Sequence, residues 1–241
     1  MLPLALAAFV VAILASFAQA ITGFGFALVA IPLLALVAGV HTAVVGVTLL
    51  SAVLTISASV HYRRDVEWAV TRRLTISALI GMPLGLAALA LLDQRWLGIG
   101  VAVLVVLFAL ASLRRLPGRA GQASVLGAGF IGGIFLTSTG MNGPPLVATL
   151  QAMDFTPGRV RATLQASFAA QDILAVAGFA IVGQLTTDSL LVLAAGLLGI
   201  PLGWLAGDLV FTRLAKGGFR IAIFLTLIGC AILLLAQTLL N

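Results

Sequence analysis

Hydrophobic residues fill long stretches of the chain, and short clusters of charged, polar or turn-forming residues separate them. Within these stretches the hydrophobic residues do not alternate with polar ones, so the strands of a membrane barrel are not indicated. Helices are the other structure that satisfies backbone groups in lipid, and about 20 helical residues cross the hydrocarbon layer. The pattern predicts hydrophobic segments at about 2–20, 26–39, 42–60, 74–92, 97–113, 123–137, 144–153, 162–183, 188–211 and 220–240.

One of these segments is too short to cross a membrane. Residues 144–153 would form a helix of roughly 15 Å, about half the thickness of the hydrocarbon layer. Asn142 can act as the N-cap of this helix, and Pro144 and Pro145 suit its first turn, where a missing N–H costs nothing. We therefore expect segments 123–137 and 144–153 to form a re-entrant hairpin with its tip at mid-depth in the membrane.

The tip of this hairpin combines polar side chains with the start of a helix. Irregular backbone at that depth is tolerated where it lines a cavity or is packed in protein, and a helix N-terminus offers N–H groups and a positive dipole end. This combination predicts an anion site, with neutral hydroxyl and amide donors and with glycines that let the backbone approach a ligand. Its candidate residues are Thr137, Ser138, Thr139, Gly140, Asn142 and Gly143. Helix packing is the alternative, because Gly, Ser and Thr are common at helix contacts in membranes.

Two short motifs recur and indicate an internal duplication. Thr22-Gly23 matches Thr139-Gly140, and "GMPLG" at 81–85 matches "GIPLG" at 199–203. The spacings agree, since 81 − 23 is 58 and 199 − 140 is 59. Proline inside a long helix produces a kink, so packing or a hinge explains the GxPLG motifs better than ligand contact.

The duplication places a related tip near the start of the chain, in "AQAITGFGFALVAIP". Its candidate ligand contacts are Gln19, Thr22, Gly23 and Gly25. This tip is less polar than the second and lacks the double proline, so the two halves need not contribute equally. Helix packing is again the alternative interpretation.

Basic residues sort the loops into two sets. When the segments are threaded alternately, four basic loops fall on one side, which the positive-inside rule makes cytoplasmic, and both termini lie outside. The motif GMPLG then follows a cytoplasmic loop and GIPLG an external one, so the repeats are inverted, as in secondary transporters. The basic residues of these loops are Arg63, Arg64, Arg72, Arg73, Arg114, Arg115, Arg119, Arg159, Arg161, Arg213, Lys216 and Arg220.

These observations predict an all-α polytopic membrane protein built from two inverted repeats. Each repeat is a broken or re-entrant helical hairpin followed by three transmembrane helices. Residues 1–120 form the first repeat and residues 121–241 the second, and together they make one transmembrane domain. In proteins of this kind the substrate site lies near the middle of the membrane.

Composition agrees with a membrane location and removes several other classes of protein. Hydrophobic residues make up 62% of the chain, charged residues 8%, and the mean hydropathy is +1.23, far from the usage of soluble domains. The net charge of +6 does not indicate nucleic-acid binding, because the arginines lie in short loops where membrane orientation explains them. The single Cys230 excludes a disulfide framework, and His41 and His61 lie at opposite membrane edges. We therefore expect no metal and no cofactor.

One carboxylate lies in the middle of a hydrophobic segment. Asp172, next to Gln171 in segment 162–183, is a candidate functional residue because charges inside a membrane are costly. A desolvated carboxyl group tends to hold a proton, so Asp172 is our candidate for proton coupling. The alternative is a protonated Asp172 that bonds to a neighbouring helix. Gln165, about two turns earlier on the same face, is a further candidate for substrate contact.

The glycine-rich "TGFGFALVAIPLL", the later "GGIFLTSTGMNGPPLVATL" and the GMPLG/GIPLG pair together resemble the TauE/SafE family of sulfite exporters. The resemblance covers essentially the whole chain, and the second motif is its most specific part. It implies a multi-pass plasma-membrane transporter of small sulfur-containing anions, such as sulfite, sulfoacetate or another sulfonate. Export is the direction that it implies.

Other functions stay open at this point. A passive anion channel could use the same half-helix, and transport against a gradient would distinguish the two. An intramembrane enzyme would need a nucleophile with a base, paired aspartates or a metal motif, and Asp172 has no second acid at its depth. The expected partners are a small anionic substrate and membrane lipid, with no nucleic acid. The sequence leaves open whether copies of the chain associate as a homo-oligomer, and which ion is coupled.

Overall fold

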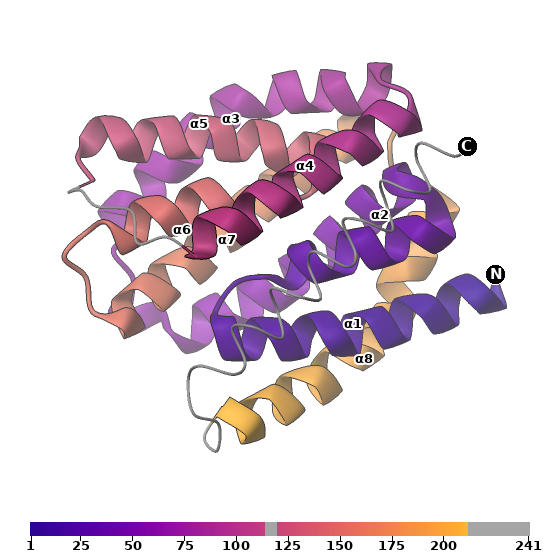
Figure 1. Cartoon of the computed structure of the whole chain (residues 1–241), viewed down its shortest axis with the longest axis horizontal. Coiled ribbons are helices and arrows are strands. Elements are labelled where there is room, and N and C mark those ends of the chain that lie inside the picture. Colours follow the sequence, from indigo (N-terminus) through magenta and orange to yellow (C-terminus); the bar gives the residue numbers. More distant parts are fainter. Residues whose placement is uncertain (114–119, 212–241) are drawn as a thin grey trace. The chain divides into compact units, whose positions relative to one another are not determined.

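A computed structural model describes residues 1–113 and 120–211 of the chain, and these residues form helices and no strand. Six of the helices (α1, α2, α3, α5, α7 and α8) are long and apolar enough to cross a membrane. The prediction of an all-α polytopic membrane protein is therefore confirmed. In chain order the elements are α1 (Leu2–Thr22), α2 (Phe26–His61), the short 3₁₀ helix η1 (Arg63–Asp65), α3 (Trp68–Leu91), α4 (Gln94–Leu113), α5 (Gln122–Thr139), α6 (Gly143–Gln151), α7 (Pro157–Ile181) and α8 (Thr187–Phe211) (Figure 1).

Helix α2 contains the break that the sequence places between segments 26–39 and 42–60. Gly39 has φ 77° and ψ 160°, which only glycine adopts readily, and the helix changes direction there. A Cβ atom at Gly39 would also lie 2.6 Å from the Oε1 atom of Gln94. The expected loop around His41 is absent, because the helix resumes directly after the glycine. The predicted segment 220–240 and the basic residues in 114–119 and 213–220 lie outside the described residues.

The described chain divides into two compact units. The first takes in the described parts of Met1–Leu50, Leu92–Arg115 and Thr186–Asn241, and the second takes in those of Ser51–Leu91 and Leu116–Leu185. Each unit combines helices from both halves of the sequence. The units therefore do not coincide with the predicted repeats 1–120 and 121–241, which stay a prediction.

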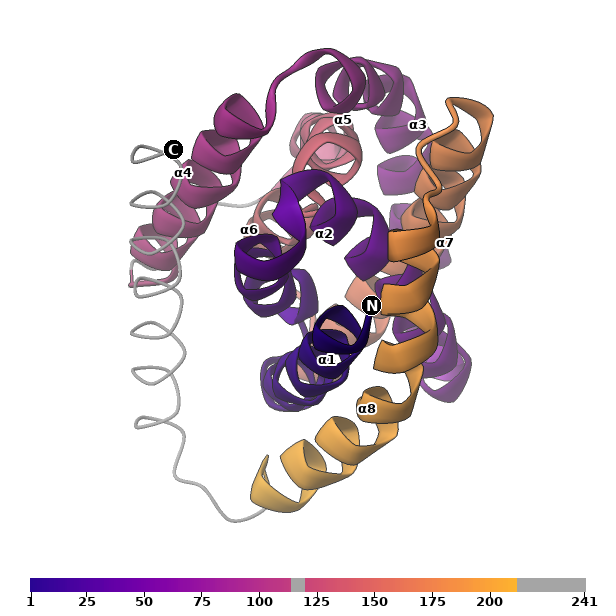
Figure 2. The ribbon, with the colours of Figure 1, turned by 90° about the vertical axis from the view of Figure 1, so that its right-hand side faces the viewer.

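In the first unit, α1 packs along α8 (Figure 2). Gly199 and Gly203 of the GIPLG motif allow this approach, because a Cβ atom on either would run into the backbone of α1. At Gly199 it would meet the carbonyl oxygen of Phe9, and at Gly203 that of Ile13 and the hydroxyl of Ser16. The motif thus serves close helix packing.

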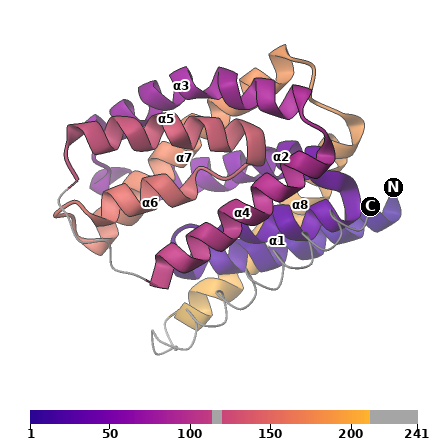
Figure 3. The same ribbon diagram turned by 45° about the horizontal axis from the view of Figure 1, so that its top comes forward.

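In the second unit, α3 packs along α5 in the same manner (Figure 3). Gly81 and Gly85 of GMPLG face the carbonyl oxygens of Phe130 and Ile134, and Gly85 also faces the hydroxyl of Thr137. The contacted residues follow one pattern in both units: a Phe, an Ile four residues later and a hydroxyl three residues after that. For both motifs the packing interpretation is confirmed.

Helices α5 and α6 form a hairpin whose two ends meet. At its base the N–H of Ala120 donates to the carbonyl of Ala152 at 3.1 Å. At its tip Gly140 ends α5 with φ 72°, a left-handed conformation that favours glycine. Helix α6 has only 9 residues and cannot cross a membrane. The hairpin therefore returns to the end from which it started, as expected for a re-entrant element.

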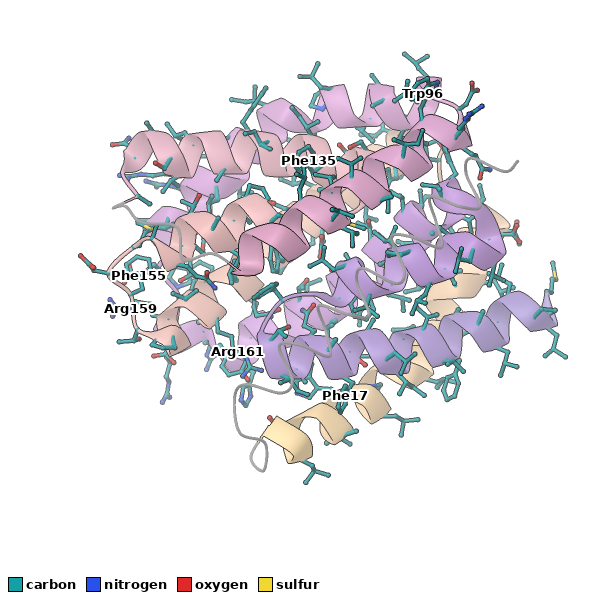
Figure 4. All side chains as sticks on the ribbon, viewed as in Figure 1. Phe17, Trp96, Phe135, Phe155, Arg159 and Arg161 are labelled. Carbon is teal, nitrogen blue, oxygen red and sulfur yellow. The ribbon has the colours of Figure 1, made fainter. Side chains whose placement is uncertain are left out.

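Two of the predicted basic loops meet at one end of the second unit. Arg159 at the start of α7 forms a 2.9 Å ion pair with Glu67, just before α3, and the backbone N–H of Glu67 donates to Thr163 of α7. The Arg161 guanidinium lies 5.0 Å from the centre of the Tyr62 ring, which precedes η1. Figure 4 labels both arginines near the α6–α7 connection. The sequence predicts that these two loops lie on the same side of the membrane, and these contacts agree with that prediction.

Candidate functional site

The polar residues at the tip of the α5–α6 hairpin are buried inside the second unit. Thr137 and Ser138 occupy the last turn of α5, and Asn142 directly precedes α6. Their relative exposures are 0%, 7% and 7% respectively, and that of Thr139 is 5%. Buried polar groups need hydrogen-bond partners, so the partners found here decide what the tip can offer a ligand.

The three hydroxyl groups donate to backbone carbonyls. Ser138 donates to Ile134 at 2.7 Å, and Thr139 donates to Phe135 at 2.8 Å, each within α5. Thr137 is within reach of Gly133 at 3.0 Å and of Met82 in α3 at 2.9 Å. A hydroxyl carries a single proton, and bonding to the carbonyl four residues earlier is a common use of it in helices. In this arrangement the hydroxyls present acceptor oxygens at the tip, and to donate to a ligand a hydroxyl would have to turn its O–H away from its carbonyl partner.

Asn142 occupies the N-cap position of α6 as predicted, but its side chain makes no capping hydrogen bond. The expected capping bond is therefore wrong. The Nδ2 group of Asn142 instead donates to the Oε1 atom of Gln171 in α7 at 2.8 Å. A helix leaves four N–H positions without an intrahelical partner, from the N-cap to the third helical residue, and because Pro144 and Pro145 lack an N–H, only Asn142 and Gly143 carry a backbone donor at these positions of α6.

Gln171 connects three parts of the second unit and was not a candidate from the sequence. Its Oε1 atom accepts from Asn142, and its Nε2 group donates to the carbonyl of Leu74 in α3 at 3.3 Å. The side chain is fully buried, at 0% exposure. The signal available in the sequence was an amide in the middle of a hydrophobic segment, directly before the aspartate.

Asp172 lies next along α7 and contacts the second half of α2. Its Oδ2 atom accepts from the hydroxyl of Ser51 at 2.8 Å and from that of Thr55 at 3.2 Å. The residue is 1% exposed. Gln165, two turns earlier on α7, is fully buried as well. Two consecutive residues of α7 therefore make these contacts: Gln171 contacts the candidate anion tip, and Asp172, the candidate proton carrier, contacts α2.

The first tip is built differently from the second. The Oε1 atom of Gln19 accepts the backbone N–H of Phe26 at 3.0 Å, so a side chain satisfies a donor at the start of α2. The Thr22 hydroxyl donates to the carbonyl of Ala18 at 2.7 Å. Gly23 and Gly25 form the turn between α1 and α2. These four candidates belong to the first unit, whereas the candidates of the second half belong to the second unit.

No three His, Cys, Asp or Glu side chains within residues 1–113 and 120–211 come together in a way that could hold a metal ion. The polar chemistry of the described site is accordingly that of amides, hydroxyls, backbone groups and one carboxyl group.

Comparison with known proteins identifies the family. A search of curated proteins and a search of solved structures give no match. The family model described as sulfite exporter TauE/SafE matches residues 8–234, which is nearly the whole chain. The protein is a member of the TauE/SafE sulfite exporter family of membrane transporters.

Proposed function

We propose that the protein exports small sulfur-containing anions, such as sulfite, sulfoacetate or a related sulfonate, across the plasma membrane. The observation that carries this proposal is the α5–α6 hairpin, which holds a half-helix and a buried amide, Asn142, at its tip. Family membership supports transport of a small anion. The positive-inside rule supports an orientation with both termini outside.

The tip suits an anion for electrostatic reasons. The segment from 136 to 150 contains no acidic residue, and α6 directs the positive end of its dipole toward the tip. Donors at the start of the half-helix are the backbone N–H groups of Asn142 and Gly143 and the side-chain amide of Asn142. Thr137, Ser138 and Thr139 end α5 just before them, and Gly140 lets the backbone come close. These donors are neutral, so they can bind an anion and release it again without breaking an ion pair.

Asp172 is the proposed proton carrier. It is the one carboxyl group within α7, and its partners within residues 1–113 and 120–211 are the hydroxyls of Ser51 and Thr55 on α2. A carboxyl group inside a membrane is costly to keep charged, and hydroxyl partners can bond to it with or without its proton. Gln165, buried on the same helix, is a further candidate for substrate contact. The first tip, with Gln19, Thr22, Gly23 and Gly25, is proposed to contribute less, because Gln19 already satisfies the start of α2.

The proposed architecture is two inverted repeats, 1–120 and 121–241. The matching glycine contacts support it, since GMPLG meets a Phe, an Ile and a hydroxyl in α5 and GIPLG meets the same series in α1. An arrangement of this kind is typical of secondary transporters and is not needed by a simple pore.

Transport into proteoliposomes tests the proposal. Labelled sulfite and a labelled short organosulfonate are offered with and without an imposed pH gradient, to the wild type and to Asn142→Ala. We expect accumulation driven by the gradient in the wild type and a loss of about tenfold or more in the variant, because a buried donor to the anion is removed. Gln122→Ala, an exposed amide in the first turn of the same hairpin, is the matched control and should behave as wild type.

The outcomes separate the alternatives. Equal downhill flux in the wild type and Asn142→Ala, with no response to the gradient, would favour a passive anion channel and return the tip to a packing role. No flux of either anion in folded protein would overturn both as substrates and reopen the question of which anion is carried.

A further inference from the structure

We infer that Gln171 is a positioning residue of the anion site: it fixes the orientation of the Asn142 amide, and with it the place of the donor that the anion meets. This inference rests on the proposed function, because it deepens the assignment of the hairpin tip. Gln171 reaches both the tip and α3, and it directly precedes the proposed proton carrier.

The first step is the orientation of Gln171 itself. A backbone carbonyl can only accept hydrogen bonds, so the group that lies 3.3 Å from the oxygen of Leu74 must be the Nε2 amide nitrogen. The reversed amide would bring two oxygens together in a fully buried place where water cannot separate them. The carbonyl of Leu74 therefore directs the Oε1 atom of Gln171 toward α6.

The second step transfers this orientation to Asn142. The Oε1 atom of Gln171 can only accept, so the atom of Asn142 at 2.8 Å from it must be Nδ2. One N–H of Asn142 is thereby used, and its second N–H and its oxygen take fixed directions at the tip. Without Gln171 the Asn142 amide could turn by about 180° and place an acceptor where the anion needs a donor.

The third step is the position of Gln171 beside Asp172. Consecutive residues of a helix point about 100° apart, so α7 contacts α3 and the hairpin tip through one residue and α2 through the next. The described partners of both side chains are neutral: Asn142, the carbonyl of Leu74, Ser51 and Thr55. A change in the hydrogen bonds of Asp172 would therefore be passed to the proposed anion site through the adjacent residue, Gln171.

Two substitutions at the same position test the inference. Gln171→Glu can reproduce both hydrogen bonds only while its carboxyl group is protonated, when it donates to Leu74 and accepts from Asn142. Gln171→Met keeps a similar length but makes neither bond. Exposed Gln151→Glu, at the end of α6, adds the same charge away from the tip and is the matched control.

Exchange of labelled sulfite and ethanesulfonate is measured in proteoliposomes with equal pH on both sides, at about pH 5 and about pH 9.5, which lie on either side of the pKa of about 8–9 documented for fully buried glutamic acids. Each rate is divided by that of the wild type at the same pH, which removes the ionisation of sulfite and the response of Asp172. We expect Gln171→Glu to stay within about twofold of wild type at the lower pH and to fall at least about tenfold at the higher pH, chiefly through KM. Gln171→Met should be reduced about tenfold at both.

A packing role would give a different result, because pH would not change it. Gln171→Met at wild-type rates, or equal loss in both variants at both pH values while Gln151→Glu is normal, would overturn the inference and leave the proposed function standing. Wild-type protein that exchanges neither anion would overturn the proposed function, and the inference would fall with it. Monodisperse elution and an unchanged thermal midpoint confirm that each variant is folded.

Discussion

At the scale of single residues, the hydroxyl of Thr55 can form a hydrogen bond with Asp172 in either of its two states, ionised or protonated. Its oxygen lies 2.8 Å from the carbonyl of Ser51 and 3.2 Å from Oδ2 of Asp172, yet it has one proton to donate. An ionised Asp172 would draw that proton. A protonated Asp172 could instead donate to Thr55 while Thr55 donates to Ser51. The same three groups can therefore satisfy both forms of the carboxyl group, as a reversible proton carrier requires.

The first prediction concerns Asp172 itself. Asp172→Asn keeps the shape and the hydroxyl contacts but cannot release a proton, so we expect accumulation driven by a pH gradient to fall at least about tenfold. Exchange of labelled anion at equal pH should stay within about threefold, because the hairpin tip is unchanged. The measurement is proteoliposome uptake in the two modes. Full gradient-driven transport by Asp172→Asn would falsify the coupling role.

The residues of the tip could largely be predicted from the sequence, but their hydrogen-bond partners could not. Four polar residues beside a forced helix start point to a site, and Asn142 does precede α6. The role of Gln171 could not be predicted, because its two partners, Asn142 and Leu74, lie 29 and 97 residues away in the sequence. Hydrophobic periodicity reports which residues face lipid or protein, but it carries no information about which distant side chains meet.

At the scale of helices, small residues decide which helices approach closely. Lipid is as apolar as a leucine side chain, so helices in membranes associate through close packing more than through the hydrophobic effect. In α3, Gly81 and Gly85 bring the backbone of α5 within contact, and Gly85 faces Thr137 at the candidate tip. The packing motif thus also sets the position of the proposed anion site.

The second prediction concerns Gly85. A methyl group there would overlap the carbonyl of Ile134 and the hydroxyl of Thr137, so Gly85→Ala should destabilise the protein by about 1–3 kcal/mol and lower the thermal midpoint. Gly127→Ala in α5 is the control, because a Cβ atom there meets nothing within 4 Å and alanine favours helix. The thermal midpoint of purified protein in detergent is the measurement. Equal midpoints for the two variants would contradict this account.

Helix boundaries show where the hydrophobic pattern stops being informative. The sequence predicts segments that begin near 74 and 162, whereas α3 begins at Trp68 and α7 at Pro157. Basic residues in the first turns end the apolar pattern, but the backbone is already helical. At α7 the hydroxyl of Thr156 caps the helix by accepting the N–H of Arg159 at 3.4 Å. For α7, the capping residue therefore locates the start of the helix better than hydropathy does.

At the scale of the whole molecule, the basic residues are informative through where they lie. The ion pair between Arg159 and Glu67 is about half exposed at Arg159, so it contributes little to stability. Its significance is that the connection from α2 to α3 and that from α6 to α7 lie at one end of the second unit. Between the α6–α7 connection and Leu185, α7 contributes 25 helical residues, enough to cross the membrane.

The third prediction is therefore the orientation of this unit in the membrane. With Cys230 replaced by serine, single cysteines are introduced as Asp65→Cys at the end of η1 and Leu185→Cys beyond α7, both at exposed positions. The positive-inside rule predicts that a membrane-impermeant thiol reagent applied to intact cells will label the cysteine at 185 and spare the one at 65. Permeabilised cells should label both, which shows that each thiol is reactive. Labelling of position 65 alone from outside would reverse the orientation, and with it the side from which the hairpin tip is reached; labelling of both in intact cells would mean that α7 does not cross.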